Sequence, residues 1–477
     1  MERKFNKNQR MAVEHGDGPC LVIAGPGSGK TYVLTNRILN LITKNDIDAE
    51  SILIITFTRA AANEMETRFF DLASSNGVRF KGYPTFGTFH SIFYDILRNV
   101  FGYTSESLLR DGEEKDILTE VLKNIKGLKD KPEAVSYVLK DIKNYKLLSE
   151  RGMKAEPKFI SSELFEEIYK EYQRKLYEVK KLDFSDMISK CYELLKSNPS
   201  VLRYYQNKYR YILIDEFQDI NKLQYDIVKL ICKSKNIFVV GDDDQSIYKF
   251  RGSYPRVIND YLKDFKKAKI VHLNENYRCA RQIVKFSKLV IDHNLERFSK
   301  DLVSNRSDLG KLEIKAFVDS VEENKYLIES IKKYLRQGQK FSDIAILYRT
   351  NLLSNSIRTD LEKYKVPYIV KGEETDDGES KHKKVLNSNA VNLMTFHLSK
   401  GLEFKTVFII DANDGLIPHK KSIKEDDLEI ERRLFYVAMT RAKDNLHILF
   451  TTRRFGKDFK PSRFILEAIG GQNEQKR

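Results

Sequence analysis

Residues 21–31, Leu-Val-Ile-Ala-Gly-Pro-Gly-Ser-Gly-Lys-Thr, combine an apolar run, a glycine-rich turn and a Lys-Thr pair. The apolar run predicts a buried strand, and the residues from Tyr32 to Leu41 predict a helix after the turn. Glycines allow backbone N–H groups to point at phosphate oxygens, and the N-terminus of the following helix adds partial positive charge. This order of strand, turn, Lys-Thr and helix predicts a phosphate-binding loop.

The residues of this loop have distinct expected roles. Lys30 can reach the β- and γ-phosphates of a nucleotide, and the Thr31 hydroxyl can hold Mg²⁺. The general pattern requires glycine where this chain has Ala24. An ordinary glycine-rich turn is the alternative interpretation, and the position of Gly-Lys-Thr directly after a predicted strand weighs against it. The predicted phosphate cradle is completed by Gly25, Gly27, Ser28 and Gly29.

A second group of candidate residues follows another apolar run, Tyr211 to Ile214. Asp215 and Glu216 come directly after it, at the C-terminal end of a predicted strand, where parallel sheets bind ligands. Asp215 suits Mg²⁺ coordination, usually through water, and Glu216 suits polarisation of an attacking water. An Asp-Glu pair alone could be a capping pair, but behind a phosphate loop it indicates nucleotide hydrolysis.

A third group begins after a predicted strand at Ile237 to Gly241. Gln245 comes just past the end of this strand and could sense a γ-phosphate. Tyr248, Phe250 and Arg251 place two aromatic rings and a cation close together, and aromatic rings can stack on bases irrespective of sequence. Taken alone, Phe250 would be better explained as a core residue.

Composition limits the class of protein. The chain has 477 residues, which suggests about three or four domains, and 41% of them are hydrophobic, enough for sizeable cores. The net charge of +15 favours a polyanionic partner such as nucleic acid, with a lysine-rich surface as the alternative.

The four cysteines lack metal-ligand spacing and are expected to be reduced core thiols of a cytoplasmic protein. No apolar run approaches ~18 residues, and the N-terminus lacks a secretory pattern, so we expect no membrane span.

Strands that alternate with helices predict an α/β fold with parallel sheets. Residues 104–181 differ, because Glu, Lys, Leu and Tyr dominate at helical spacing and predict an all-helical insertion. Its lysines and tyrosines could serve a nucleic-acid surface, although solvated helix faces explain them better. Leu446 to Phe450 is expected to close the second sheet. The predicted domains are a first α/β domain of residues 1–103 and 182–269, the helical insertion of residues 104–181, and a second α/β domain of residues 270–477 that contains a polar, exposed or disordered loop at 371–389.

The set of motifs resembles the UvrD/Rep/PcrA family of superfamily 1 DNA helicases over nearly the whole chain. Ala24, which departs from the general phosphate-loop pattern, is what this family usually carries. The matching motifs stand in family order at Gln9, Ala24–Thr31, Ile55–Thr58, Gly87–Ser91, Ile214–Asp219, Val240–Tyr248, Asn276–Arg278, Leu347–Asn351, Met394–Glu403 and Glu431–Arg441.

The resemblance implies two RecA-like P-loop motor folds with ATP between them and Mg²⁺ as cofactor. Phosphoryl transfer needs charge neutralisation at the γ-phosphate, and the implied roles meet that need. The residues assigned to ATP in this way are Gln9 and Tyr277 at the adenine; Lys30, Thr31 and Asp215 at the phosphates and Mg²⁺; Glu216 as the catalytic base; Gln245 at the γ-phosphate; Arg278 and Arg441 as arginine fingers; Glu403 near the ribose or γ-phosphate; and Arg37 as a further nucleotide contact.

For nucleic acid, the resemblance implies a single-strand channel with 3′→5′ movement. Stacking at ~1–3 kcal/mol per base would give grip without reading sequence. The expected partners are single-stranded DNA and 3′-tailed duplex DNA, and the protein is expected to be a monomer in solution. The residues assigned to DNA are Phe57, Thr58, Thr88, His90, Tyr248, Phe250, Arg251, Arg349, Asn351, His397 and Phe455.

Three positions depart from the family pattern. Phe250 stands where relatives commonly have Trp, which should weaken stacking, and Tyr32 stands where relatives often have Arg. Relatives also carry a long helical subdomain, regulatory and in contact with duplex DNA, where this chain has the polar run 371–389. We therefore expect a minimal, uninhibited motor, with vigorous translocation but weak unwinding as the competing outcome.

Three functions follow from these motifs. The first is an ATP-dependent 3′→5′ DNA helicase with DNA-stimulated ATPase activity. The second is a translocase that displaces proteins from single strands without efficient unwinding. The third is a scaffold that does not hydrolyse ATP. Against it stand the intact residues Lys30, Asp215, Glu216, Gln245, Arg278 and Arg441.

Overall fold

The computed structural model describes residues 4–79, 81–110, 112–125, 128, 132–150, 153, 156–249, 252–254, 256–372, 389–422, 425–454 and 456–474. The chain forms two compact units. The first comprises Met1–Ile23, Lys30–Gly241 and Tyr248–Val271, and the second comprises Ala24–Gly29, Asp242–Ile247 and His272–Arg477. Two short segments that are flanked in sequence by the first unit therefore pack within the second.

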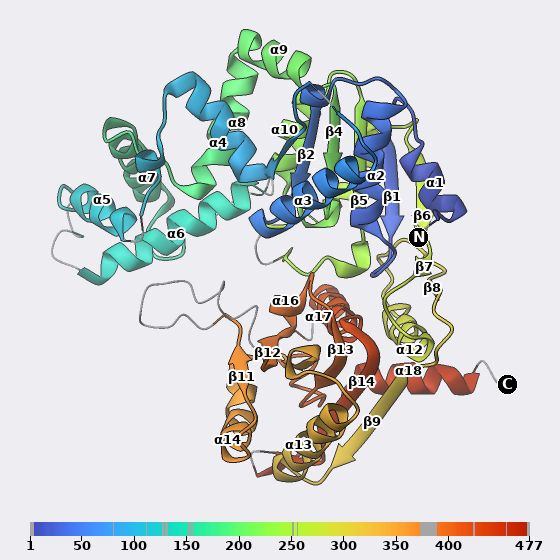
Figure 1. Cartoon of the computed structure of the whole chain (residues 1–477). Helices are drawn as coiled ribbons and strands as arrows, with labels where there is room; N and C mark the ends of the chain where they lie inside the picture. Colours follow the sequence, from blue (N-terminus) through green and yellow to red (C-terminus); the bar gives the residue numbers. More distant parts are fainter. Residues whose placement is uncertain are drawn as a thin grey trace. The chain divides into compact units, whose positions relative to one another are not determined.

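The first sheet has six strands in the order β3-β2-β4-β5-β1-β6 (Figure 1). The pairs β2·β3, β2·β4, β4·β5 and β1·β5 are parallel. Its inner strands are buried along almost their whole length, as expected for apolar strands covered on both faces. The strands are β1 (Cys20–Ala24), β2 (Ile52–Thr56), β3 (Thr85–Thr88), β4 (Tyr211–Ile214), β5 (Asn236–Gly241) and β6 (Lys269–Leu273).

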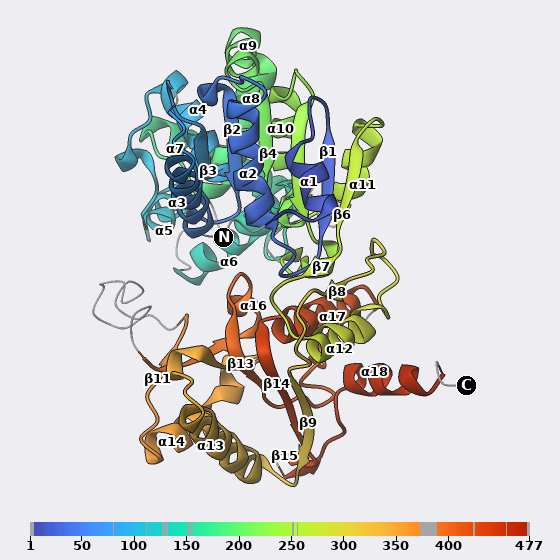
Figure 2. The same ribbon diagram turned by 45° about the vertical axis from the view of Figure 1, so that its right-hand side comes forward.

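Helices cover both faces of this sheet. Figures 1 and 2 show α2 (Lys30–Thr43) and α3 (Arg59–Ser75) on one face, with α4 (Phe89–Phe101), α8 (Phe184–Ser197) and α10 (Lys222–Ile231) on the other. Connections between parallel strands are right-handed, so the direction of each step along the sheet decides which face the connecting helix covers. From β1 through β2 to β3 the chain moves in one direction, and from β3 through β4 to β5 it moves back, so the two sets of helices lie on opposite faces. The remaining elements around the sheet are α1 (Lys7–Val13), η1 (Ala49–Ser51), α9 (Pro199–Lys208), η3 (Phe217–Asp219) and α11 (Val257–Asp264).

A group of helices separates α4 from α8: η2 (Ser105–Ser107), α5 (Glu113–Leu122), α6 (Pro132–Glu150) and α7 (Ser162–Glu178). These helices have a hydrophobic core of their own, built from residues such as Leu118, Ile142 and Ile168. The two chain segments that enter and leave the group pair at its base, where the Leu109 N–H donates to the Leu182 carbonyl at 3.1 Å.

The second sheet has six strands in the order β11-β12-β10-β13-β14-β9, and all five pairings are parallel. With the first sheet, it confirms the predicted α/β class with two parallel-sheet folds. The expectation that Leu446 to Phe450 closes the sheet was wrong, because β9 lies at the edge beyond β14. In β9, lysine and glutamate alternate with apolar residues, a pattern typical of an exposed edge strand. The strands are β9 (Lys311–Phe317), β10 (Ile344–Tyr348), β11 (Tyr368–Val370), β12 (Val391–Thr395), β13 (Phe404–Ile409) and β14 (Ala442–Thr451).

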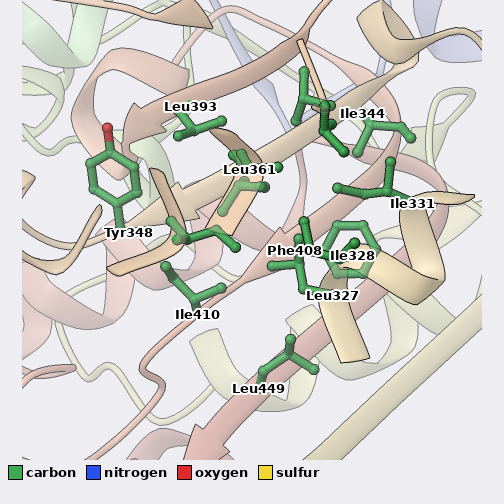
Figure 3. Packing of buried hydrophobic residues seen from close by; sticks show 14 of the residues in the cluster. Leu327, Ile328, Ile331, Ile344, Tyr348, Leu361, Leu393, Phe408, Ile410 and Leu449 are labelled. Atoms are coloured by element: carbon green, nitrogen blue, oxygen red, sulfur yellow. The ribbon is translucent and has the colours of Figure 1, made fainter. Parts of the chain in front are cut away.

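The core of the second unit lies between this sheet and its helices. Figure 3 shows Leu327, Ile328 and Ile331 of α13 packed near Phe408 of β13 and Ile344 of β10. The remaining elements of the unit are η4 (Asp243–Gln245), β7 (Glu275–Asn276), α12 (Arg281–Ile291), β8 (Val303–Ser304), α13 (Ser320–Arg336), η6 (Phe341–Asp343), η7 (Asn351–Ser354), α14 (Asn355–Lys363), α16 (Phe396–Ser399), α17 (Glu425–Met439), β15 (Arg453–Arg454), β16 (Lys457–Asp458) and α18 (Arg463–Glu474).

Candidate nucleotide site and nucleic-acid surface

The glycine loop links β1 to the N-terminus of α2, as the sequence predicts. Gly27 and Gly29 have φ values of 65° and 87°, a backbone region that favours glycine. The Ser28 hydroxyl donates to the Gly25 carbonyl at 2.7 Å and closes the turn. Lys30 and Thr31 are the first two residues of α2, so the loop has the backbone arrangement that binds phosphate.

The two acidic residues follow β4. The Asp215 N–H donates to the Ile55 carbonyl at 2.9 Å, which continues the pairing with β2. Glu216 has a left-handed φ of 50°, and its N–H donates to Oδ1 of Asp215 at 2.9 Å. A left-handed backbone in a residue other than glycine is strained and often marks a functional turn. The turn places Oε1 of Glu216 3.1 Å from Nζ of Lys30.

Gln218 holds the same carboxylate from the other side. Its Nε2 donates to Oε2 of Glu216 at 2.5 Å and to Oδ2 of Asp219 at 3.3 Å. Glu216 therefore has a cation on one oxygen and an amide donor on the other. Gln218 lies within the motif Ile214–Asp219, and its residue type alone does not indicate this contact.

In the second unit, the glycine loop contacts the segment Asn276–Arg278. Nδ2 of Asn276 donates to the Pro26 carbonyl at 2.7 Å, and the Tyr277 N–H donates to the Gly27 carbonyl at 2.9 Å. A Cβ added to Gly27 would lie 2.6 Å from Cβ of Arg278. Gly27 is therefore needed for this close approach as well as for its backbone conformation.

Arg278 is held by acidic Glu403. Its Nε donates to Oε2 of Glu403 at 2.7 Å, and Nζ of Lys443 lies 2.5 Å from the other carboxylate oxygen. Burial raises the pKa of Glu403, but Lys443 and Arg278 outweigh it and lower the pKa overall. The two cations thus keep Glu403 ionised, and Glu403 fixes the Arg278 side chain beside the glycine loop.

Arg441 and Gln245 also meet in the second unit. Nη2 of Arg441 donates to Oε1 of Gln245 at 3.3 Å, and its Nε and Nη1 donate to the carbonyls of Val437 and Leu402. Nζ of Lys400 donates to the Gln245 carbonyl at 2.8 Å. The structure brings two residues predicted at the γ-phosphate into direct contact.

Two other residues predicted to contact nucleotide, Gln9 and Arg37, are buried and form local contacts. Gln9 forms a capping box with Asn6, in which each side chain accepts from the other residue's N–H, at the start of α1. Arg37 donates to the carbonyls of His15 and Gly16 and lies over the Phe238 ring at 4.4 Å. Burial is the main reason that the pKa of Arg37 falls to about 10. Both residues therefore have structural roles in the first unit, and their contacts with nucleotide stay predictions.

Aromatic side chains form two pairs in the first unit. Phe57 and Tyr248 stack with ring centroids 5.5 Å apart and planes 10° apart. His90 meets Phe184 edge to face at 5.8 Å, and burial lowers the pKa of the imidazole. Phe184 is 60% exposed, and sequence reasoning missed it. The sequence shows only that a large aromatic residue stands at the start of a predicted helix. It gives no indication that this residue lies beside His90.

Two predicted DNA contacts are helix caps. The hydroxyl of Thr58 accepts from the Ala61 N–H at the start of α3, and the hydroxyl of Thr88 accepts from the Ser91 N–H at the start of α4. The Thr58 hydrogen bond fixes the turn between β2 and α3, next to Phe57. The Thr88 hydrogen bond fixes the first turn of α4, which contains His90.

The predicted DNA contacts of the second unit follow β10 and β12. Arg349 donates to both oxygens of Glu431 at 2.6–3.1 Å, and the His419 N–H donates to the same carboxylate at 3.1 Å. Asn351 is exposed at the start of η7, and His397 lies in α16. The predictions for Phe250, Arg251 and Phe455 lie outside the described residues, as does most of the predicted loop 371–389.

The described part of the chain contains no cluster of three or more His, Cys, Asp or Glu side chains that could hold a metal ion. Asp215 and Thr31 would need phosphate and water oxygens to complete a Mg²⁺ site. Within the same described ranges, no helix has the length and apolarity needed to cross a membrane.

The amino-acid sequence is similar to that of known helicases along most of its length. Residues 5–266 match the UvrD/REP helicase N-terminal domain, and residues 271–376 and 373–453 match the UvrD-like helicase C-terminal domain. YjcD from Bacillus subtilis (strain 168) is 30% identical over 97% of this chain and 80% of its own length. The ATP-dependent DNA helicase PcrA of Staphylococcus epidermidis is 29% identical over 98% of this chain and 86% of its own length. PcrA of Staphylococcus aureus is 29% identical, with 97% and 86% covered.

The domain matches together span most of the chain and occur in the order of the two sheets. The predicted resemblance is thereby confirmed: this chain belongs to the UvrD/REP family of helicases.

Proposed function

We propose that this chain is an ATP-driven motor that moves 3′→5′ along single-stranded DNA and separates duplex ahead of it. The observation that carries the proposal is the pairing of Lys30 with Glu216 at 3.1 Å, behind a glycine loop in a chain of the UvrD/REP family. A phosphate-binding cation and a carboxylate able to accept a proton thus share one site. Family membership supports DNA as the substrate, and the relatives named PcrA are called ATP-dependent DNA helicases.

ATP would bind with its phosphates against the glycine loop and the N-terminus of α2. Lys30 would neutralise the β- and γ-phosphates. Mg²⁺ would be held by the Thr31 hydroxyl and, through water, by Asp215. A hydroxyl and a carboxylate are hard oxygen ligands of the kind that Mg²⁺ prefers, so these residues fit the ion.

Hydrolysis requires a base for water and cations for the developing charge. Glu216 would accept a proton from the water whose oxygen attacks the γ-phosphorus, and the bond to the β-phosphate oxygen would break. Arg278 and Arg441 would stabilise the charge on the transferring phosphoryl group. This assignment is supported by the packing of Arg278 against Gly27 and by the contact of Arg441 with Gln245.

Single-stranded DNA would be gripped by stacking on aromatic rings, of which Phe184 is exposed while Phe57, Tyr248 and His90 are partly buried. The parallel pair Phe57–Tyr248 and the edge-to-face pair His90–Phe184 offer aromatic surfaces on the first unit. Because every base has a π-face, such contacts are tolerant of sequence, which suits a motor that moves along DNA.

A paired assay with one preparation tests the proposal. ATP hydrolysis is measured with and without single-stranded DNA, and strand separation is measured on duplexes with a 3′ or a 5′ tail. The proposal predicts hydrolysis that DNA stimulates and unwinding from the 3′ tail alone. Absence of DNA-stimulated hydrolysis would refute the motor function, and unwinding from the 5′ tail alone would refute the polarity.

A translocase without efficient unwinding is the second candidate. The alignment with YjcD is 612 residues long although this chain has 477, so the relative contains residues without a counterpart here. The two C-terminal matches meet at residues 373–376, at the start of a segment that lies outside the described residues. We infer that relatives carry their additional residues at this position. Strong DNA-stimulated hydrolysis without strand separation from either tail would favour this second function.

A further inference from the structure

Three consecutive aspartates, Asp242, Asp243 and Asp244, follow β5 and pack within the second unit. Nζ of Lys300 lies 2.9 Å from an oxygen of Asp242 and 2.6 Å from oxygens of both other aspartates. The Lys300 side chain is only 3% exposed. One buried ammonium group therefore contacts all three carboxylates.

Arg297 completes the charge balance from the same side. Its Nε and Nη2 donate to the two carboxylate oxygens of Asp244 at 2.9 and 2.7 Å. Burial lowers the pKa of Lys300, but the three carboxylates outweigh it and raise the pKa above its usual value. Lys300 thus stays charged, and removal of its charge would take away the one cation that contacts all three buried carboxylates, with Arg297 still paired with Asp244.

Asp242 connects this cluster to the candidate γ-phosphate residues. Oδ1 of Asp242 faces Lys300, while Oδ2 accepts from Nε2 of Gln245 at 2.6 Å. The other end of the same amide, Oε1 of Gln245, accepts from Nη2 of Arg441 at 3.3 Å. A continuous path of contacts therefore runs from Lys300 through Asp242 and Gln245 to Arg441.

We propose that Lys300, acting through Asp242, is a positioning residue that orients the Gln245 amide and the Arg441 guanidinium toward the γ-phosphate. This inference rests on the proposed ATPase function. Lys300 holds the Asp242 carboxylate in place through Oδ1, and the other oxygen, Oδ2, accepts from Nε2 and so determines which way the amide of Gln245 points. Nothing in the motifs around Gln245 or Arg441 indicates this residue, because it follows Asp242 by more than fifty positions in the chain.

The test uses the full chain with Lys300→Met, Lys300→Arg and the control Lys263→Met. Lys263 is an exposed lysine of the first unit that pairs with Asp260. Lys300→Met is expected to lower kcat for DNA-stimulated ATP hydrolysis at least about tenfold, as for a misplaced catalytic group, with KM for ATP and Kd for ADP within about twofold of wild type. Lys300→Arg should restore most of kcat, and Lys263→Met should match wild type.

A double-mutant cycle separates positioning from general stabilisation. If Lys300 acts through Gln245, Lys300→Met should lower the single-turnover rate little further in a chain that already carries Gln245→Ala. If Lys300→Met and Gln245→Ala lower the rate independently, so that their effects multiply in the double mutant, the inference is overturned. Equal losses in ADP affinity and in kcat for Lys300→Met would overturn it as well. If Lys300→Met fails to fold, Asp242→Asn takes its place in the same cycle, with the same expected coupling to Gln245→Ala.

Failure of this inference and failure of the proposed function have different signatures. Wild-type protein without DNA-stimulated hydrolysis would refute the proposed function. Active wild type with independent effects of Lys300→Met and Gln245→Ala would refute the positioning role alone.

Discussion

Nζ of Lys30 and Oε1 of Glu216 lie 3.1 Å apart, so the cation of the glycine loop and the carboxylate after β4 compensate each other's charge. A nucleotide phosphate placed beside Lys30 would compete with Glu216 for the same ammonium group. Binding of ATP would therefore free the carboxylate at the moment when a base is needed. In the proposed mechanism, this relationship would link nucleotide binding to the release of Glu216 as the base, within the first unit.

Replacement of Glu216 by glutamine tests this link. Glu216→Gln is expected to lower single-turnover ATP hydrolysis by at least about 100-fold, because water loses its base. Kd for ATP should stay the same or fall, because Lys30 loses a competing carboxylate. Fluorescence titration with a labelled ATP analogue measures the affinity. Affinity that weakens tenfold would show that Glu216 helps to hold the nucleotide, against this account.

Phe184 is expected to bind single-stranded DNA although no motif indicated it. Phe184→Ala removes an exposed ring beside His90, and loss of one stacked base should weaken binding by about 1–3 kcal/mol. Fluorescence anisotropy with a labelled oligonucleotide measures Kd. The matched control is Tyr177→Ala, since Tyr177 is an exposed aromatic of α7. Equal losses in both variants would mean that any exposed ring contributes, and no loss in Phe184→Ala would refute the contact.

Asn276 is expected to stabilise the second unit. Its buried side chain donates to the Pro26 carbonyl and accepts from the N–H groups of Arg278 and Cys279. Asn276→Ala leaves these groups unpaired, which typically costs about 1–3 kcal/mol each, so the midpoint of urea unfolding should fall. Kd for ATP should rise as well, because the glycine loop loses an anchor.

The matched control for this variant is Asn305→Ala. Asn305 is an exposed asparagine of the same unit whose side chain donates to Glu275. Its substitution should change the unfolding midpoint little, since water replaces the lost hydrogen bond. A destabilisation equal to that of Asn276→Ala would contradict the role given to the buried side chain.

Stability should depend on pH through two buried carboxyl groups of the second unit. Glu323 of α13 accepts from the Asp411 N–H, and Nη2 of Arg454 lies 2.8 Å from Oδ2 of Asp411. Burial, and then the Asp411 charge, raises the pKa of Glu323 to about 8. Burial also raises the pKa of Asp411 to about 7, against the pull of Arg454. Arg454 is therefore near two carboxyl groups, those of Glu323 and Asp411, whose burial disfavours ionisation.

The sign of the effect follows from proton binding. Between about pH 5 and pH 8 the folded protein holds protons that the unfolded chain has released, so stability falls as the pH rises through this window. Glu323→Gln removes one of these groups. The melting temperature of the variant relative to wild type should therefore increase from pH 5.5 to pH 8. Parallel pH profiles of the two proteins would contradict the assignment.

Much of the fold, and the local geometry of the candidate nucleotide site, could be predicted from sequence because the signals for both are local. The glycine loop needs adjacent residues of fixed type, and the carboxylates sit directly after an apolar strand. β9 was missed because its alternating lysines and glutamate resemble a solvated segment until β14 is seen beside it. The edge position of a strand is a property of the whole sheet, which a local pattern does not contain.

The remaining parts of the site depend on contacts between distant residues. Nothing near Lys300 in sequence indicates the three aspartates that it neutralises, and nothing near Phe184 indicates His90. Thr58 and Thr88 belong to motifs that the resemblance assigns to DNA, and in the structure their hydroxyls cap helices. A threonine can serve either role, so the residue type alone does not indicate the cap, and contact of these two residues with DNA stays a prediction.

As proposed, ATP hydrolysis would drive this chain along single-stranded DNA toward the 5′ end. Stopped-flow fluorescence can follow this movement in a single ATP-triggered round, on oligonucleotides of increasing length that carry a dye at the 5′ end or at the 3′ end. We expect a lag that lengthens with the oligonucleotide when the dye is at the 5′ end, and no such lag when it is at the 3′ end. The opposite pattern, or signals independent of length at both ends, would contradict it.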